Sequence, residues 1–392
     1  MSGFKELIRR VKSEIREIPV EEARRARERG AVFLDVREAD EWSDGQIAGA
    51  LVIPRGFLEQ RIEEKLKDKA TEIVAYCAGG TRSAFAARTL ADLGYRNVVS
   101  LAGGFGKWKE AGEPIVLPRT LSAEQKRRYS RHLLVPEVGE TGQHKLLDAK
   151  VLLIGAGGLG SPAGLYLAAA GVGTLGIVDS DVVDVSNLQR QVLHTNASVG
   201  KPKTASAAAT IRALNPDVTV VEHNLRLDSS NVLGVIQPYD VIVDGCDNFA
   251  TKYLVNDAAV LTGKTVVYGS IFRFEGQASV FKPGAGPCYR CLFPEPTPSE
   301  LAASCDEAGV LGVLPGTIGL IQATETLKLL LGAGRSLVGR LLTYDALEAS
   351  YREFRLRRDP ACAVCGDKPS IREVSDLEWS CHFEPRPTPV GA

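Results

Sequence analysis

The chain has no excess of charge of either sign and little cysteine for its length. Lys and Arg number 47 against 48 Asp and Glu, a formal net charge of -1 over 392 residues. A protein held on nucleic acid or on anionic lipid needs a basic surplus, so we expect neither as a partner. The 8 cysteines are too sparse for a disulfide scaffold, which favours metal binding or thiol chemistry in a reducing compartment.

Long apolar runs are absent as well. The most apolar stretch, residues 163–178, is interrupted by four glycines and ends at Asp179, so it is too short and too broken to span a bilayer. The first seven residues include Lys5 and Glu6, where a signal peptide needs an apolar run, so we expect a cytoplasmic protein. A content of 44% hydrophobic and 24% charged residues is typical of folded domains.

The length predicts two or three domains, and one stretch marks a boundary. Residues 111–120 contain Pro114, Pro118 and Gly112, which break regular structure. We therefore expect a first domain over 1–118 and a second over 119–392. On both sides, apolar runs alternate with helical patterns, which predicts α/β folds with parallel sheets. The expected strands are 31–36, 72–76, 98–101, 151–154, 175–178, 217–222, 241–243 and 265–268.

Cys77 is the candidate nucleophile of the first domain. It follows the apolar run 73–76 and opens a loop into a helix expected near Ser83. Backbone N–H groups of such a loop and the helix N-terminus lower a thiol pKa, and the thiolate is the reactive form. The glycines at 79 and 80 permit the tight turn, and Arg82 adds positive charge. A buried structural cysteine and a phosphatase loop of similar length are the alternatives.

Four segments around this loop resemble the rhodanese family of sulfurtransferases: residues 35–38, 41–42, 77–83 and 101–108. The resemblance covers about residues 14–118 and implies that Cys77 carries a persulfide. The persulfide loop would consist of Cys77, Ala78, Gly79, Gly80, Thr81 and Arg82. Residues 45–50 depart from the family, which commonly has His and Pro there, and this change affects a structural turn.

A glycine-rich motif at residues 155–160 is the first candidate ligand-binding motif of the second domain. It follows the strand expected at 151–154 and begins a helix, which is the context of a dinucleotide or nucleotide fingerprint. Asp179 comes 19 residues after Gly160, where a carboxylate can bind ribose hydroxyls. The motif alone fits NAD, FAD and ATP equally.

The polar segments that follow distinguish these ligands. Asp181 and residues 186–191, 200–203 and 244–248 resemble the E1-like enzymes that adenylate ubiquitin-like proteins and bacterial sulfur carriers. The similarity is closest to the molybdopterin-synthase and thiazole-pathway adenylyltransferases. Together, the two resemblances imply a rhodanese-like parallel-sheet domain followed by a Rossmann-like adenylation domain, to which the cysteine pairs described below add a structural zinc site.

This resemblance also implies residue roles. Arg190 and Lys203 would neutralise the triphosphate of ATP, and Asp247 would hold Mg2+. Arg131 would reach the γ-phosphate in the neighbouring subunit, which requires a homodimer. Cys305 is a possible covalent partner of the carrier tail. The nucleotide-binding set would be Gly155, Gly157, Gly158, Gly160, Asp179, Asp181, Ser186, Asn187, Leu188, Gln189, Arg190, Lys203, Asp247 and Asn248.

Two C-x-x-C pairs point to a metal. Cys288 and Cys291 form the first, and Cys362 and Cys365 form the second. Four thiolates in two such pairs suit a closed tetrahedral Zn2+ of structural type. A redox role is disfavoured on the expectation that neither pair begins a helix, as a thioredoxin motif does.

The sequence therefore predicts a bifunctional enzyme. It would use ATP to adenylate the C-terminal glycine of a small sulfur-carrier protein ending in Gly-Gly, in the molybdopterin, thiamine, cysteine or tRNA thiolation pathway. A persulfide on Cys77, supplied by a cysteine desulfurase or another sulfur donor, would then give a thiocarboxylate. The alternative is a dinucleotide-binding redox protein with an appended regulatory rhodanese-like module.

Overall fold

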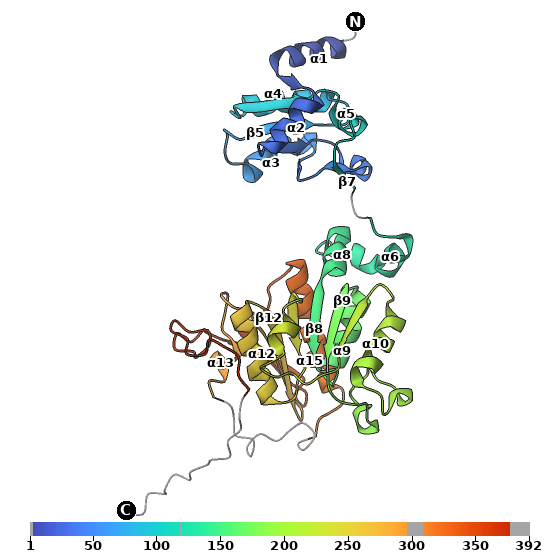
Figure 1. The fold of residues 1–392 in the computed structure, drawn as a ribbon, viewed down its shortest axis with the longest axis vertical. Helices are drawn as coiled ribbons and strands as arrows, with labels where there is room; N and C mark the ends of the chain where they lie inside the picture. Colours follow the sequence, from blue (N-terminus) through green and yellow to red (C-terminus); the bar gives the residue numbers. More distant parts are fainter. Residues whose placement is uncertain (1–2, 118–119, 296–308, 377–392) are drawn as a thin grey trace, which may run out of the picture. The chain divides into compact units, whose positions relative to one another are not determined.

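The computed structural model describes residues 3–117, 120–295 and 309–376 (Figure 1). Its contacts divide the chain into two compact units, Met1–Thr120 and Leu121–Ala392, each with its own hydrophobic core. Within the described residues, no helix is both long enough and apolar enough to cross a membrane.

The first unit is an α/β layer structure. Its main sheet has the strand order β1-β6-β5-β2-β4, with every neighbouring pair parallel, and β3 and β7 form a separate antiparallel pair. The elements are α1 (Gly3–Glu14), β1 (Glu17–Ile18), α2 (Val20–Glu28), β2 (Val32–Asp35), η1 (Ala39–Asp44), β3 (Gln46–Ile47), β4 (Leu51–Val52), η2 (Arg55–Phe57), α3 (Leu58–Lys65), β5 (Glu72–Tyr76), α4 (Thr81–Asp92), β6 (Asn97–Leu101), α5 (Gly104–Glu110) and β7 (Ile115–Val116).

Strand β5 shows why this sheet is covered on both faces. Side chains alternate along a strand, so Val74 and Tyr76 enter one core with residues of α2 and α5, including Trp108. Ile73 and Ala75 enter the opposite core with residues of α3 and α4. The strand is therefore apolar at every inner position, as central parallel strands are.

The second unit contains an eight-stranded mixed sheet in the described residues. Strands β10-β9-β8-β11-β12 are parallel, and β13, β14 and β15 extend the sheet antiparallel. The elements are α6 (Ala123–Arg128), α7 (Ser130–Leu133), α8 (Gly139–Asp148), β8 (Lys150–Ile154), α9 (Gly160–Ala170), β9 (Thr174–Val178), η3 (Val185–Asn187), η4 (Asn196–Ser198), α10 (Lys203–Leu214), β10 (Thr219–His223), α11 (Val232–Ile236), β11 (Val241–Asp244), α12 (Phe249–Thr262), β12 (Thr265–Phe272), β13 (Glu275–Phe281), α13 (Tyr289–Leu292), α15 (Leu314–Leu331), β14 (Arg340–Asp345) and β15 (Ser350–Arg355).

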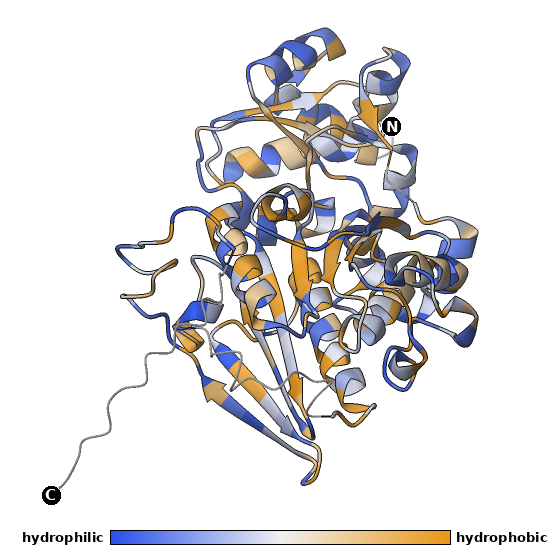
Figure 2. Ribbon diagram, turned by 60° about the horizontal axis from the view of Figure 1, so that its bottom comes forward, coloured by the Kyte–Doolittle hydropathy of each residue, from blue (hydrophilic) through white to orange (hydrophobic). Residues whose placement is uncertain are grey.

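Strand β8 separates two cores in the same way as β5. Val151 and Leu153 pack with residues of α9, α10 and α15, whereas Leu152 and Ile154 pack with residues of α11 and α12. Figure 2 shows the hydrophobic colouring concentrated on the strands and the hydrophilic colouring on outward helix faces. The chain reverses its direction of winding between β8 and β11, and α/β folds bind ligands at the carboxyl ends of strands flanking such a switch point.

Three expectations from the sequence need correction. The sheet of the second unit is not purely parallel, because β13, β14 and β15 run antiparallel. The proline-rich stretch expected as linker contains β7, which pairs with β3 of the first unit. Helix α4 begins at Thr81, two residues before the expected start, so the helix N-terminus lies within the Cys77 loop.

Candidate active sites

Cys77 lies at the carboxyl end of β5 and is almost wholly buried, with 1% of its surface exposed. The Gly80 N–H donates to its Sγ at 3.1 Å, and the Ser83 hydroxyl lies 3.6 Å from the same sulfur. Ser100 in turn donates to the Ser83 oxygen at 2.9 Å. These donors stabilise negative charge on the sulfur, which is the requirement for a thiolate nucleophile.

The glycines around Cys77 are required by geometry. Gly80 adopts a φ of 92°, in the region that favours glycine, and a Cβ there would lie 3.1 Å from the Gly103 nitrogen. Gly104 also has a positive φ, and its Cβ would lie 2.2 Å from the Cys77 carbonyl oxygen. This close approach lets the Phe105 N–H at the start of α5 donate to that oxygen at 2.7 Å. The turn of the loop is thus fixed by α4 and α5 together.

Arg82 does not stand as an isolated positive charge in this loop. Its two terminal nitrogens donate to both carboxylate oxygens of Glu41, at 2.5 and 2.7 Å. The hydrogen bond from Arg82 lowers the pKa of Glu41 to about 2. The expectation that Arg82 adds positive charge therefore overlooked a partner 41 residues away.

The second unit contains a cavity of about 580 Å³ at the carboxyl ends of β8, β9, β11 and β12. Nine of the residues predicted to bind nucleotide line it, and the size falls within the usual range of small-molecule sites. They are Gly155, Gly157, Gly158, Asp179, Asp181, Arg190, Lys203, Asp247 and Asn248.

Two glycines of the loop between β8 and α9 leave no room for a side chain. A Cβ at Gly155 would lie 2.9 Å from the Gly245 carbonyl oxygen, and one at Gly160 would lie 1.9 Å from the Gly155 oxygen. Asp179 holds the loop from β9, accepting from the Ala156 N–H at 2.9 Å. The result is exposed backbone beside the N-terminus of α9, which is the arrangement that binds phosphate groups.

Charged side chains of both signs surround the cavity. Lys203 is buried at the start of α10 and pairs with Asp181 at 2.8 Å. Arg190 donates to the Ser186 carbonyl oxygen at 3.2 Å and also lines the cavity. Asp247 is exposed at the mouth, after β11. Two cations and a carboxylate therefore line the same cavity, and side chains of these types can neutralise phosphate oxygens and hold Mg2+.

Other predicted residues lie outside the cavity lining. Asn187 accepts from the Asp184 N–H at 3.0 Å, within the turn that contains η3. The others are Gly160, Ser186, Leu188 and Gln189. Arg131 is exposed on α7 and does not line the cavity of its own chain. Cys305 lies outside the described residues.

Sequence reasoning missed a buried ion pair at the wall of the cavity, where Lys252 is one of the lining residues. Lys252 on α12 pairs with Asp244 at 2.9 Å, and both side chains are at least 95% buried. Asp244 also accepts from the Cys246 thiol at 2.7 Å, and burial raises the pKa of that thiol, which fits an unreactive cysteine. A lysine within the mostly apolar helix Phe249–Thr262 was the available signal.

The four cysteines of the two C-x-x-C pairs come together. Their sulfur atoms lie within 4.8 Å of one another, with Sγ–Sγ distances of 3.9 Å for 288–291, 3.6 Å for 288–362 and 3.3 Å for 291–365. A tetrahedral Zn2+ with bonds of about 2.3 Å places its sulfurs about 3.8 Å apart, so the cluster fits this ion. The closed set of four thiols leaves no ligand position for catalysis.

One argument against redox chemistry at these cysteines was wrong. Cys288 is the N-cap of the short helix α13, so the first pair does begin a helix. The clustering itself supplies the better argument, because a redox disulfide needs two thiols and this site assembles four from segments 71 residues apart.

Family models match both units of the chain. A model described as the ThiF family matches residues 129–364, and one described as a rhodanese-like domain matches residues 19–111. A sulfur carrier protein adenylyltransferase of Thermus thermophilus is 53% identical over 66% of this chain and 97% of its own length. The probable adenylyltransferase/sulfurtransferase MoeZ of Mycobacterium tuberculosis is 55% identical over 68% of each chain. The adenylyltransferase and sulfurtransferase MOCS3 of Sus scrofa is 49% identical over 68% of this chain and 59% of that protein.

Solved structures share the fold of the larger part of the chain. Crystal structures of E. coli MccB with ATP and of MccB alone superpose with TM-scores of 0.54 and 0.55. They are 23% and 24% identical, cover 61% and 64% of this chain, and in both cases 74% of MccB is matched. At this identity the likeness establishes the fold alone.

Proposed function

Because the chain belongs to the ThiF family and carries a rhodanese-like domain ahead of the matched region, we propose that it is a sulfur-carrier adenylyltransferase and sulfurtransferase. Its division into an N-terminal sulfurtransferase domain, 1–118, and an adenylation domain, 119–392, is part of the proposal. The observation that carries it is the convergence of nine nucleotide-motif residues on one cavity at the switch point of the sheet.

In the adenylation step, the C-terminal glycine carboxylate of the carrier attacks the α-phosphorus of ATP. A glycyl adenylate forms and pyrophosphate leaves. Arg190 and Lys203, which line the cavity, neutralise phosphate oxygens, and the glycine loop donates backbone N–H groups to those oxygens. Asp247 would hold Mg2+, which would supply positive charge to neutralise phosphate oxygens. The remaining work of the protein is positioning, which converts a bimolecular encounter into an oriented one.

In the sulfur step, the terminal sulfur of a Cys77 persulfide attacks the activated glycine carbonyl, and AMP leaves. The product is an acyl disulfide between the carrier and Cys77. A second thiol then breaks the S–S bond, releases the carrier as a thiocarboxylate and leaves a disulfide on that thiol and Cys77, which a further thiol reduces. The Gly80 N–H and the Ser83 hydroxyl stabilise the Cys77 sulfur when it carries negative charge.

Three further features complete the proposal. The exposed Arg131 acts on ATP in the neighbouring subunit of a homodimer, since it does not line the cavity of its own chain. The four-cysteine cluster holds a structural Zn2+ that joins the segment after β13 to the one after β15. The sulfur comes from a cysteine desulfurase or another persulfide donor, and the free thiols favour the cytoplasm.

Exchange of radiolabelled pyrophosphate into ATP tests the adenylation step, because the reaction is reversible. We expect exchange that depends on a Gly-Gly-ended carrier and that is lost in Asp247→Ala. The variant should keep its zinc content, since Asp247 is exposed and its removal empties no core. Exchange at the wild-type rate in Asp247→Ala, or none with any Gly-Gly carrier in the wild type, would refute the assignment.

A further inference from the structure

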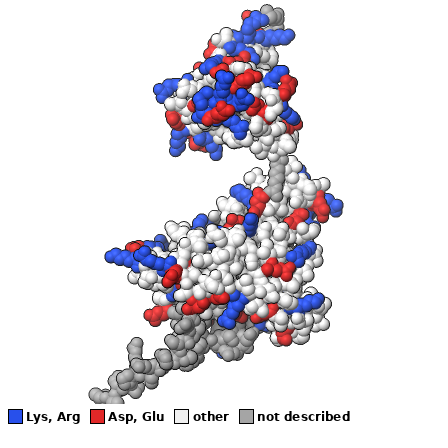
Figure 3. Space-filling view, in the orientation of Figure 1, with Lys and Arg blue, Asp and Glu red and all other residues white. Residues whose placement is uncertain are grey.

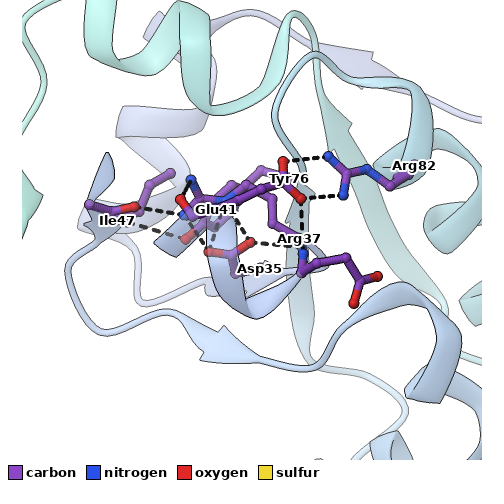
Figure 4. Close-up of polar contacts among 8 residues, drawn as sticks. Asp35, Arg37, Glu41, Ile47, Tyr76 and Arg82 are labelled. Carbon is purple, nitrogen blue, oxygen red and sulfur yellow. Dashed lines mark hydrogen bonds and ion pairs between the residues drawn. The ribbon is translucent and has the colours of Figure 1, made fainter. Parts of the chain in front are cut away.

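Arg82, the last residue of the Cys77 loop, forms an ion pair with Glu41. Arg82 lies on α4 and Glu41 on η1, and the Arg82 guanidinium faces the Glu41 carboxylate (Figure 4). The side chains are only 35% and 28% exposed. Arg82 is the sole cation within the segment 77–82, so this pair neutralises the positive charge that the loop itself supplies.

Glu41 is held in place independently of Arg82. One of its oxygens also accepts from the Glu38 N–H at 3.0 Å in a capping box of η1. The Glu41 carbonyl oxygen accepts from Arg37, whose guanidinium lies over the Phe105 ring at 4.1 Å and is almost wholly buried. The carboxylate is therefore fixed before any ligand arrives, unlike that of a loose surface pair.

Other cations of the first unit also have carboxylate partners. Arg37 pairs with Asp35 at 2.7 Å, Arg55 with Glu59 at 2.8 Å and Lys107 with Glu110 at 2.6 Å. Figure 3 shows basic and acidic side chains interspersed over the visible face of this unit. The two groups that donate to the Cys77 sulfur, the Gly80 N–H and the Ser83 hydroxyl, are both neutral.

We infer that Glu41 is a specificity-determining residue: by neutralising Arg82 it makes the Cys77 site favour a singly charged persulfide donor over a dianionic donor such as thiosulfate. The inference rests on the proposed sulfur transfer through Cys77. A dianion approaching a thiolate is repelled more strongly than a monoanion, and only an unpaired cation at the loop would offset that repulsion.

Both loading reactions are balanced displacements at sulfur. With thiosulfate, the Cys77 thiolate attacks the outer sulfur, the S–S bond breaks and sulfite leaves with the electron pair. With a persulfide anion R–S–S⁻, the thiolate attacks the terminal sulfur, the S–S bond breaks and R–S⁻ leaves. In each case Cys77 ends as a persulfide, and cyanide can remove the outer sulfur as thiocyanate and restore the thiolate.

The test compares two donors in one assay, thiocyanate formation by the full chain. The donors are thiosulfate and 2-mercaptoethanol persulfide, with kcat/KM determined for each. Glu41→Gln keeps the side-chain shape and removes the charge, so we expect the thiosulfate-to-persulfide ratio of kcat/KM to rise about fivefold. The rise should come from a lower KM for thiosulfate and should shrink with added salt.

A control variant is available at the start of β5, the strand that Cys77 directly follows. Glu72 begins β5 and pairs with Arg29 at 2.6 Å, roughly 17 Å along the strand from Cys77. Glu72→Gln removes the same charge from a more exposed Arg–Glu pair, and we expect it to leave the ratio unchanged. Arg82→Gln leaves Glu41 unneutralised and should lower the ratio, which tests the inference even if Glu41→Gln fails to fold.

The outcomes separate the inference from the function on which it rests. An unchanged ratio in Glu41→Gln, equal losses with both donors, or the same rise in Glu72→Gln would overturn the role of Glu41. A rise that disappears in the double variant Glu41→Gln/Arg82→Gln would support it. If the wild type transfers sulfur from neither donor, or Cys77→Ala transfers it normally, the proposed sulfur transfer itself fails.

Discussion

Replacing Lys252 by methionine should destabilise the second unit by about 3–5 kcal/mol, because it leaves the Asp244 carboxylate buried without a cation. The two groups are 2.9 Å apart, and their side chains are 5% and 4% exposed. At that separation an effective dielectric constant of 20 gives an attraction of about 6 kcal/mol, which offsets the cost of removing both charges from water. Lys252 also donates to the Gly269 carbonyl oxygen at 3.0 Å, and that bond is lost too.

A double variant separates the effect of the unpaired Asp244 charge from the effect of changed packing around residue 252. Asp244→Asn with Lys252→Met removes both charges and keeps an oxygen for the Cys246 N–H, which donates to Asp244 at 3.1 Å. We expect the double variant to be more stable than Lys252→Met by about 2 kcal/mol or more, since no isolated charge remains.

Equilibrium urea unfolding of the full chain, followed by near-ultraviolet circular dichroism, measures these differences. Tyr253, Tyr268 and Tyr289 form a cluster of aromatic contacts next to the ion pair and supply the signal. A Lys252→Met variant within about 1 kcal/mol of the wild type would refute the reasoning. So would a double variant less stable than the single one.

The other predictions concern the two sites and the metal. Arg131→Ala and Asp247→Ala should each lack pyrophosphate exchange. A mixture of the two variants should recover part of the exchange, because a mixed dimer has one site with both wild-type residues. No recovery after verified subunit exchange would count against a role for Arg131 in trans. The chain should bind about one Zn2+, measured by atomic absorption. The Cys362→Ser variant should lose the metal and unfold at a lower temperature. A zinc-free wild type purified without chelator would contradict this prediction. The folded pKa of Glu41 is about 2, against an ordinary value of 4.5, so its pair with Arg82 stabilises the fold fully above pH 4.5 and loses its effect as the pH falls towards 2. The difference in urea midpoint between wild type and Glu41→Gln should shrink over that window, and a constant difference would show that the pair does not contribute.

Features encoded by neighbouring residues could be predicted from the sequence. The apolar run 151–154 followed by the glycine motif specified β8, the phosphate loop and α9, because each depends on residues adjacent in the chain. The cysteine cluster could also be predicted across 71 residues, since C-x-x-C spacing is specific to few chemistries.

Features formed by residues that are far apart in the sequence, or that depend on tertiary packing, could not be predicted from the sequence. Glu41 and Arg82 are separated by 41 residues and meet only because η1 and α4 lie at the same end of the sheet. Asp244 and Lys252 are close in sequence, but burial of both charges depends on packing around α12 that no local pattern shows. Strands β14 and β15 were missed because their side chains are mostly partly or fully exposed, so the apolar pattern typical of the central strands is absent.

The mass of the carrier after reaction tests the central claim most directly. A Gly-Gly-ended carrier is incubated with ATP, Mg2+, a persulfide-generating desulfurase, a thiol reductant and either the wild type or Cys77→Ala. We expect the wild type to convert the carrier to the mass of its thiocarboxylate, whereas Cys77→Ala gives the adenylate and no thiocarboxylate beyond the rate without enzyme. Thiocarboxylate formation by Cys77→Ala at the wild-type rate would show that sulfur does not pass through Cys77 and would contradict the account.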